Sequence, residues 1–303
     1  MLRSLMMRLK SGTEHLNYGR EIIQNWGADL YSQKVQSIQA EQTRGNDAGV
    51  AGKKRTRSGN HPQSSFRVLD IGSGPGTDLH NVRLEIENRQ LADARLPLEL
   101  WGIESYKPNI DKCKQLGIRT AQCDIEKEDF PGKEGKYDLL IANQVLEHTK
   151  EIFWIMAEAG RLLRHGGHFI VGVPNIASLH NRLLLMLGQQ PTQIQSMSAH
   201  VRGFTKPDFR QFATTGELFR LIRFRGSNFY PLPPVLSRPL ARIFPTLAWG
   251  SFYLLERTGR EGTFLECLWG DADFLETPFF GGPQNPTRSG WHKQWLKQIA
   301  NKS

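Results

Sequence analysis

The sequence predicts an α/β fold, with a doubly wound, mostly parallel seven-stranded sheet, an added N-terminal helix and a C-terminal tail. Three observations lead to this prediction. Short apolar segments alternate with helical patterns, an order that produces a parallel sheet with helices on both faces. A glycine-rich turn follows the first strand, as in doubly wound proteins. Residues 137–142 are almost continuously apolar, as strands buried on both faces are.

Five of the expected strands lie in the first part of the chain. Before them, residues 15–37 carry apolar side chains at spacings that favour one helix face. Residues 42–65 are rich in glycine, asparagine, serine, lysine and arginine, which predicts a flexible linker. Helices are expected from Thr77 onward and over residues 109–116 and 150–163. The strands are expected at residues 66–71, 98–103, 118–123, 137–142 and 168–173.

The alternation becomes less regular beyond Pro174. Residues 176–202 predict an inserted helix and loop, and residues 208–213 predict a short helix. A sixth strand is expected at residues 219–225, although its apolar residues also suit a helix face, and a seventh at residues 248–255. We therefore expect three parts: an N-terminal helix with a basic linker over residues 1–65, one domain over residues 66–257, and a partly ordered tail over residues 258–303.

The composition limits the classes of partner. The net charge is +9 and the sequence pI is about 9.6, which suits anionic partners such as nucleic acid, anionic lipid or phosphorylated substrates. Basic runs occur at residues 53–57 and 220–225. The first run is either a solvated linker or a phosphate-binding arm. The three cysteines are scattered, so neither a disulfide framework nor a metal site is expected.

The expected location follows from what the sequence lacks. Residues 1–10 have no uninterrupted apolar region of the kind a signal peptide needs. No stretch approaches the roughly 20 apolar residues of a membrane span. We therefore expect a cytoplasmic protein. Residues 231–244 mix leucine, valine and isoleucine with two arginines, so this segment either packs on the sheet or lies on an anionic membrane surface.

The most informative motif runs from Asp70 to Gly76, directly after the first strand. Its glycines, Gly72, Gly74 and Gly76, have G-x-G-x-G spacing, unlike the G-x-G-x-x-G of dinucleotide-binding dehydrogenases. The motif resembles the first motif of class I S-adenosylmethionine-dependent methyltransferases, a Rossmann-like family. The resemblance implies that the turn, including Ser73, wraps the methionine part and ribose of S-adenosylmethionine (SAM). It also implies that Asp70 orients the turn or the ligand's ammonium group.

Two further acids follow consecutive expected strands, as the resemblance requires. Glu104 would accept hydrogen bonds from both ribose hydroxyls, with Ser105 beside it. Asp124 would accept from the adenine amino group, and Ile125 would supply its backbone amide. Carboxyl ends of parallel strands share one edge of a sheet, so we expect these groups to face one crevice.

The fourth strand leads into the sequence N-Q-V-L-E-H, residues 143–148. Its Glu-His pair resembles ubiquinone-biosynthesis-type and MetW-like methyltransferases, and the resemblance implies that Asn143 and Gln144 line the SAM pocket. His148 is either a general base or a histidine that packs beside the cofactor. The sequence lacks the Asn/Asp-Pro-Pro-aromatic motif of enzymes that methylate base amino groups, which makes nucleic acid an unexpected partner.

Residues 176–205 resemble the acceptor lid of the same relatives, some of which modify glycans or lipids. His180, His200 and Arg202 are therefore candidate acceptor contacts, and His200 is a second candidate base. Arg202 either holds a carboxylate or phosphate through two hydrogen bonds or pairs with a local acid. For His200 the alternative is a role as the cap of a loop.

We expect methyl transfer from SAM to an oxygen of a small-molecule, lipid-precursor or glycan acceptor. Methyl transfer needs mainly alignment and exclusion of water. Two alternatives stay open. One is a SAM-binding regulatory or partner subunit with little catalysis. The other is an RNA-directed methyltransferase that uses the basic residues 53–57 as an electrostatic arm.

Overall fold

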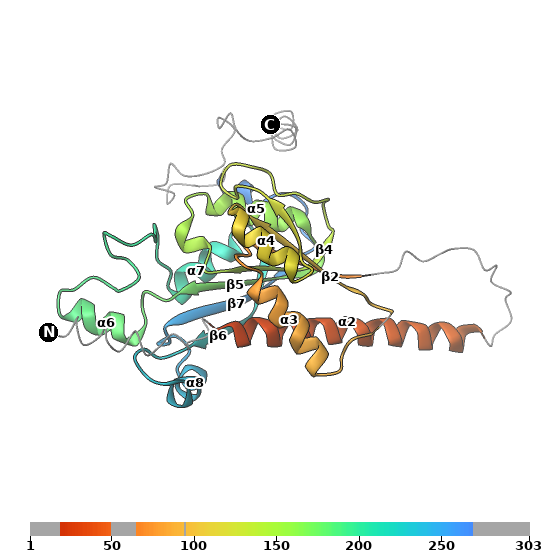
Figure 1. Cartoon of the computed structure of the whole chain (residues 1–303), viewed down its shortest axis with the longest axis horizontal. Coiled ribbons are helices and arrows are strands. Elements are labelled where there is room, and N and C mark those ends of the chain that lie inside the picture. Colours follow the sequence, from red (N-terminus) through yellow and green to blue (C-terminus); the bar gives the residue numbers. More distant parts are fainter. Residues whose placement is uncertain (1–18, 50–64, 94, 269–303) are drawn as a thin grey trace.

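The computed structural model describes residues 19–49, 65–93 and 95–268. Its centre is a seven-stranded sheet with strand order β3-β2-β1-β4-β5-β7-β6 (Figure 1). All neighbouring pairs are parallel except those of β7, which runs antiparallel to both β5 and β6. The predicted fold class is therefore confirmed. The strands are β1 Phe66–Ile71, β2 Leu98–Glu104, β3 Arg119–Gln122, β4 Tyr137–Asn143, β5 Leu163–Pro174, β6 Phe219–Ser227 and β7 Gly250–Arg257.

Two apolar layers enclose the sheet, because successive strand residues point to opposite faces. Val68 and Leu139 pack into one layer, and Leu69 and Leu140 pack into the other. The first layer is covered by α2 Arg20–Gly49, α3 Thr77–Asn88 and α4 Lys107–Gln115. The second is covered by α5 Ile152–Leu162, α7 Lys206–Thr214 and the short helix η3 Phe264–Leu268.

Helix α2 is longer at its carboxyl end than the sequence predicts. We expected a helix over residues 15–37 and a linker from residue 42, but the helix continues to Gly49. Its first half is anchored to the domain, for example through the Tyr31 hydroxyl, which donates to the Leu96 carbonyl at 2.7 Å. Described side chains from Gln39 to Thr43 are exposed. Alanine, glutamate and glutamine favour helix without packing, which accounts for the helix over residues 39–42.

Parts of the predicted organisation lie outside the described residues. They are residues 15–18 of the expected N-terminal helix, the basic run at residues 53–57 and most of the predicted tail, from residue 269. The sixth segment forms a strand rather than a helix, and the seventh closes the sheet between β5 and β6.

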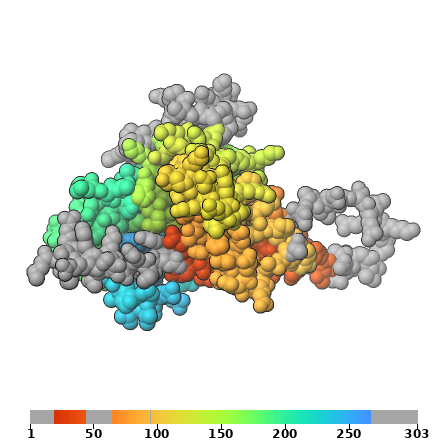
Figure 2. All heavy atoms as spheres, viewed as in Figure 1, coloured from red at the N-terminus to blue at the C-terminus, as the bar shows by residue number. Residues whose placement is uncertain are grey.

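The segment after β5 contains two further α-helices of the described part of the chain. They are α6 Leu179–Met186, inside the predicted lid, and α8 Pro234–Ile243, inside the predicted amphipathic stretch. The light-blue atoms of the α8 region project from the body of the molecule (Figure 2). Val235 and Ile243 of this helix are largely exposed, whereas Ala241 is buried with Phe229 and Ala248. Among the described helices, none combines the length and the apolar character needed to cross a membrane.

Candidate functional site

The glycine turn after β1 is closed at both ends and open in the middle. Gly72, Gly74 and Gly76 have φ angles of +68°, +52° and +82°. Residues other than glycine rarely adopt such positive φ angles. A Cβ atom at Gly72 would lie 2.9 Å from Val145, and one at Gly76 would lie 2.7 Å from Ile118. A Cβ at Gly74 would meet no atom within 4 Å. The backbone at Gly74 is therefore bare on the side where a ligand can approach.

Ser73 ties this turn to the neighbouring strand. Its backbone N–H donates to the Ile103 carbonyl at 2.9 Å, and its carbonyl accepts from the Gly76 N–H at 2.9 Å. Its hydroxyl lies 3.8 Å from the Cys113 sulfur and is buried. Ser73 thus shapes the turn through its backbone, and its hydroxyl faces the protein rather than the open side of the turn.

A group of carboxyls surrounds the turn, with one cation beside them. Asp70 is buried at the end of β1, and burial together with nearby Asp78 and Glu104 raises its pKa well above the usual range. Asp78 lies in the first turn of α3, where burial likewise raises its pKa. Arg20 from the start of α2 forms an ion pair with Asp78, with Nε and Oδ1 3.2 Å apart. Neither Arg20 nor Asp78 was predicted from the sequence.

The acid at the end of β2 is held in a fixed orientation. Glu104 Oε1 accepts from the backbone N–H groups of Ser105 and Tyr106, both at 2.8 Å, and Oε2 accepts from Asn109 Nδ2 at 3.3 Å. A carboxylate has about four acceptor positions, so these bonds leave capacity for ligand hydroxyls. The Ser105 side chain is exposed beside it.

Asp124 lies next to Glu104, because Cys123 N–H donates to the Glu104 carbonyl at 3.3 Å. Asp124 Oδ1 accepts from the Glu126 N–H at 3.0 Å, and Oδ2 pairs with Lys127 Nζ at 3.0 Å. The following residue, Ile125, is partly buried and packs against the core. The structure thus brings both predicted ligand acids to the same edge of the sheet.

The end of β4 joins the turn from its other side. Asn143 Nδ2 donates to Asp78 Oδ2 at 3.0 Å, and Asn143 Oδ1 is buried without a hydrogen-bond partner among the described residues. Gln144 has φ +58°, unusual for a residue with a side chain, and its N–H donates to the Gly172 carbonyl at 2.8 Å. Asn143 therefore lies between α3 and Gly172, where a Cβ would be 2.5 Å from Asn143 Oδ1, and Gln144 leads into Val145, which contacts Gly72 of the turn.

Two predicted histidines come together beyond β4. The rings of His148 and His200 are 4.5 Å apart in an edge-to-face arrangement. His148 lies in the short helix η1 Leu146–His148, and its Nδ1 is 3.3 Å from the Ala199 carbonyl. That contact favours a proton on Nδ1 and leaves Nε2 as an acceptor. Burial and the neighbouring His148 lower the pKa of His200, which keeps that imidazole neutral near pH 7.

A buried glutamate completes this cluster. Glu147 is 1% exposed, and neither carboxyl oxygen has a hydrogen-bond partner among the described residues. Burial raises its pKa to about 8. One ligand atom from each of Glu147, His148 and His200 lies within 4.8 Å of the others, a spacing at which a carboxylate and two imidazoles can share a cation. The expectation that the protein has no metal stays a prediction.

The two predicted acceptor contacts in the lid have local roles. Arg202 donates from Nε to the Thr149 carbonyl at 3.2 Å and from Nη2 to the Lys150 carbonyl at 2.9 Å, so it fastens the lid to the segment after η1. The ring nitrogens of His180 lie 3.1 Å from Ser178 Oγ and 3.0 Å from Thr192 Oγ1. His180 is buried, and burial lowers its pKa to about 4. This environment favours a structural role for His180 instead of the predicted acceptor contact.

The geometry fits SAM. The bare backbone at Gly74 suits close approach of a ligand, and Glu104 and Asp124 offer acceptors for hydroxyl and amino groups. Asp70 and Asp78 carry raised pKa values, so a cationic ligand that favours their ionised forms would be stabilised there. SAM carries both an ammonium and a sulfonium group.

Comparisons with known proteins agree with this geometry. A family model described as a methyltransferase domain matches residues 62–226. An uncharacterized 37.1 kDa protein in transposon TN4556 of Streptomyces fradiae is 31% identical over 116 residues, which are 37% of this chain and 31% of that protein. The chain therefore spans less than a third of that relative's length.

Two further similarities cover more of the other protein. A ubiquinone biosynthesis O-methyltransferase of Burkholderia pseudomallei is 25% identical over 184 residues, which are 59% of this chain and 71% of that protein. The crystal structure of a SAM-dependent methyltransferase from Archaeoglobus fulgidus aligns with 13% identity and a TM-score of 0.44, covering 64% of this chain and 87% of that one. The family match alone spans more than half of the 303 residues, and so the chain belongs to the class I SAM-dependent methyltransferase family, with SAM as its cofactor.

Proposed function

We propose that the protein transfers a methyl group from SAM to an oxygen of a small-molecule, lipid-precursor or glycan acceptor. The observation that carries this proposal is the pairing of His148 with His200, whose lowered pKa leaves a neutral imidazole available as a base. A hydroxyl acceptor must lose its proton, as must an active methylene, whereas a neutral amine can attack the methyl group before it loses one. The name of the similar Burkholderia protein, an O-methyltransferase, gives additional support.

The position of the pair follows from the contacts around Val145. This residue lies against Gly72 of the glycine turn, and the His148 N–H donates to the Val145 carbonyl at 3.0 Å. The helix η1 therefore begins at the turn and ends at the histidine pair. The lid reaches the same place, because the Val201 N–H donates to the Glu147 carbonyl at 2.8 Å. An acceptor held under the lid would lie between a base and the cofactor turn.

Each residue then has a distinct task. When bound, SAM supplies an electrophilic methyl group. Glu104 and Asp124 orient the cofactor, and the turn fixes its distance from the sheet. His200 accepts the proton of the acceptor hydroxyl, with His148 beside it as the alternative base. The lid, fastened by Arg202, excludes water from the reacting atoms.

The test is a product analysis with SAM and a panel of acceptors, each of which presents a phenol, alcohol, carboxylate, amine or active methylene group. Mass spectrometry identifies which atom gains the methyl group. We expect oxygen methylation, and we expect kcat/KM to fall as pH drops through the lowered pKa of His200. Replacing both histidines, His148→Asn with His200→Asn, should lower kcat by about 100-fold or more while leaving SAM affinity unchanged.

His165→Asn is the matched control, because that histidine is exposed at the start of β5. A product methylated on carbon or nitrogen would contradict the proposal, as would full activity of the double variant. SAM binding without turnover of any acceptor would favour the regulatory-subunit alternative.

We also propose peripheral contact with a membrane through α8. Val235 is 82% exposed and Ile243 is 66% exposed, and Arg238 and Arg242 lie on the same helix. Such a helix can place apolar side chains among lipid headgroups while its arginines meet anionic lipid. In a flotation assay with anionic vesicles, Val235→Glu with Ile243→Glu should reduce the bound fraction. Leu84→Glu, an exposed leucine of α3, should not. Wild-type protein that stays at the bottom of the gradient would refute the contact.

A further inference from the structure

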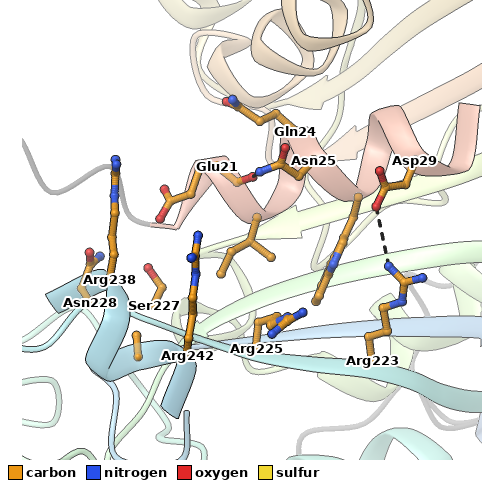
Figure 3. A pocket seen from close by; sticks show the side chains of 14 residues that line it. Glu21, Gln24, Asn25, Asp29, Arg223, Arg225, Ser227, Asn228, Arg238 and Arg242 are labelled. Carbon is orange, nitrogen blue, oxygen red and sulfur yellow. Dashed lines mark hydrogen bonds and ion pairs between the residues drawn. The ribbon is translucent and has the colours of Figure 1, made fainter. Parts of the chain in front are cut away.

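A basic pocket opens between α2, β6 and α8 (Figure 3). Its volume is about 770 Å³, which is within the range of small-molecule sites. None of its lining residues belongs to the cofactor turn or to the histidine cluster. Four arginines line it: Arg223 and Arg225 from β6, and Arg238 and Arg242 from α8.

The fold brings these arginines together in two pairs. Arg223 and Arg225 are two residues apart on a strand, so both side chains leave the same face of the sheet. Arg238 and Arg242 are four residues apart on a helix and therefore lie on one helix face. Gly226 allows the two elements to approach, because a Cβ there would lie 2.5 Å from the Pro245 carbonyl oxygen. The side chains consequently converge on one space from two directions.

The positive charge of the pocket is only partly balanced. Arg223 pairs with Asp29 of α2 at 3.6 Å. Arg225, Arg238 and Arg242 have no acidic partner among the residues that the structure describes. Like-charged guanidinium groups held near one another favour a ligand with several negative oxygens. Phosphate suits several guanidinium groups better than a single carboxylate does, since it has more anionic oxygens and can therefore accept paired hydrogen bonds from more than one guanidinium.

Three buried polar atoms at the pocket add a second, independent observation. Asn228 and Ser227 are 7% and 3% exposed, and Asn228 Nδ2 and Ser227 Oγ have no hydrogen-bond partner in the described part of the chain. Glu21 Oε2 is also buried there without one. Buried polar groups are normally satisfied, so this set is incomplete without a ligand or water. The two donors match phosphate oxygens, and Glu21 matches a ligand hydroxyl.

We propose that this pocket binds the phosphate ester of a hydroxylated ligand. The arginines and Asn228 hold the phosphate oxygens, and Glu21 accepts from a hydroxyl of the same ligand. The phosphate ester belongs either to a soluble polyol phosphate or to the headgroup of an anionic lipid. The site is separate from the methyl-transfer site, so it does not depend on the function proposed above.

Isothermal titration calorimetry of the full chain with glycerol 3-phosphate tests the proposal. We expect saturable binding that weakens with added salt, and no binding of glycerol itself. The variant Arg225→Gln with Arg242→Gln should weaken binding by at least about tenfold. Arg220→Gln is the matched control, because this arginine of the same strand pairs with Glu256 outside the pocket. Thermal unfolding of each variant shows whether it is folded.

A second measurement distinguishes the two sources of phosphate. Phosphatidylcholine vesicles with and without phosphatidic acid are sedimented with the protein. Binding of the soluble ester without capture by the acidic vesicles supports a soluble ligand. Capture that glycerol 3-phosphate inhibits and that the double variant loses supports a lipid headgroup. If neither probe binds, or if the folded double variant binds both as well as the wild type, the proposal is wrong.

Discussion

Arg20 at the start of α2 and Asp78 in the first turn of α3 form an ion pair, with 3.2 Å between Nε and Oδ1. Asp78 also accepts from Asn143 at the end of β4. The N-terminal helix is thereby linked to the first turn of α3 and to the end of β4, the strand that precedes His148. A segment that the sequence predicts as an appendage thus supplies a cation that pairs with a buried carboxyl of the site.

Replacing Arg20 should therefore weaken cofactor binding. In Arg20→Ala the pKa of Asp78 rises further because its cation is gone, and the protonated carboxyl no longer attracts the positive charges of SAM. We expect the dissociation constant for SAM, measured by calorimetry, to increase by about tenfold, and the free energy of unfolding to fall by about 1 kcal/mol. Arg20→Lys retains the charge and serves as the control. An Arg20→Ala variant with unchanged SAM affinity would show that the pair is only structural.

Substitutions at two positions of the glycine turn should affect different properties, namely SAM binding at Gly74 and stability at Gly76. Gly74→Ala and Gly76→Ala share the strain of a positive φ, about 1 kcal/mol each. Only Gly76→Ala adds a collision, because its Cβ would lie 2.7 Å from Ile118 and 3.0 Å from Cys113. Thermal unfolding should thus show the larger loss for Gly76→Ala. Calorimetry should show weakened SAM binding for Gly74→Ala despite its intact fold. Equal SAM affinity in Gly74→Ala and wild type would contradict the assigned ligand face.

The buried Glu147 should make the free energy of unfolding depend on pH. In the unfolded chain its carboxyl loses the proton near the ordinary value of 4.5, whereas in the folded protein burial raises the pKa to about 8. Between these values the folded state holds one more proton, so stability falls as pH rises. Glu147→Gln removes this dependence. With chelator present, the stability gain of Glu147→Gln over wild type should grow across that pH window and reach up to about 5 kcal/mol above it.

The measurement is urea unfolding of both proteins at several pH values. Glu126→Gln is a control for a nearby carboxylate that is less buried. A stability difference between Glu147→Gln and wild type that stays constant with pH would show that Glu147 is ionised throughout.

We expect Asp138 to contribute strongly to the attachment of α2 to the sheet. This buried carboxylate of β4 accepts from Lys34 Nζ at 2.6 Å, from Arg164 Nε at 2.7 Å and from the Arg67 N–H at 2.9 Å. Asp138→Ala leaves these donors without their acceptor, and we expect a loss of about 3 kcal/mol in unfolding free energy. Asp111→Ala breaks an exposed pair with Lys114 and should change stability by less than about 1 kcal/mol. Equal effects of the two substitutions would argue that α2 packs independently of Asp138.

The sheet and the cofactor turn could be predicted because their signals are local. The strand at residues 137–143 is mostly apolar, and the glycines from Gly72 to Gly76 follow a strand and precede a helix. The end of α2 could not be predicted. Its described side chains from Gln39 to Thr43 are exposed, so no apolar face marks this part of the helix, and the glycine and asparagine of residues 45–46 suggest a loop.

The rest of the site depends on contacts between distant segments. Glu147 stands beside His148 in the sequence, yet nothing local shows that its carboxyl is buried without partners. The arginines of β6 and α8 are each visible as charged residues of their own segments. Only the packing of α8 on the strand makes them one pocket. His180 is visible in the sequence as a candidate acceptor contact, but its ring nitrogens contact Ser178 and Thr192 and so join two parts of the lid.

The position of β7 has a consequence for synthesis on the ribosome. β5 is complete at Pro174, but its second neighbour begins only at Gly250. Until that strand has left the exit tunnel, the nascent chain presents one side of β5 with unpaired N–H and carbonyl groups and apolar side chains, a surface that readily pairs with other chains. Chains truncated before residue 250 should therefore aggregate, and the growing polypeptide should bind chaperones until its last strand inserts between β5 and β6.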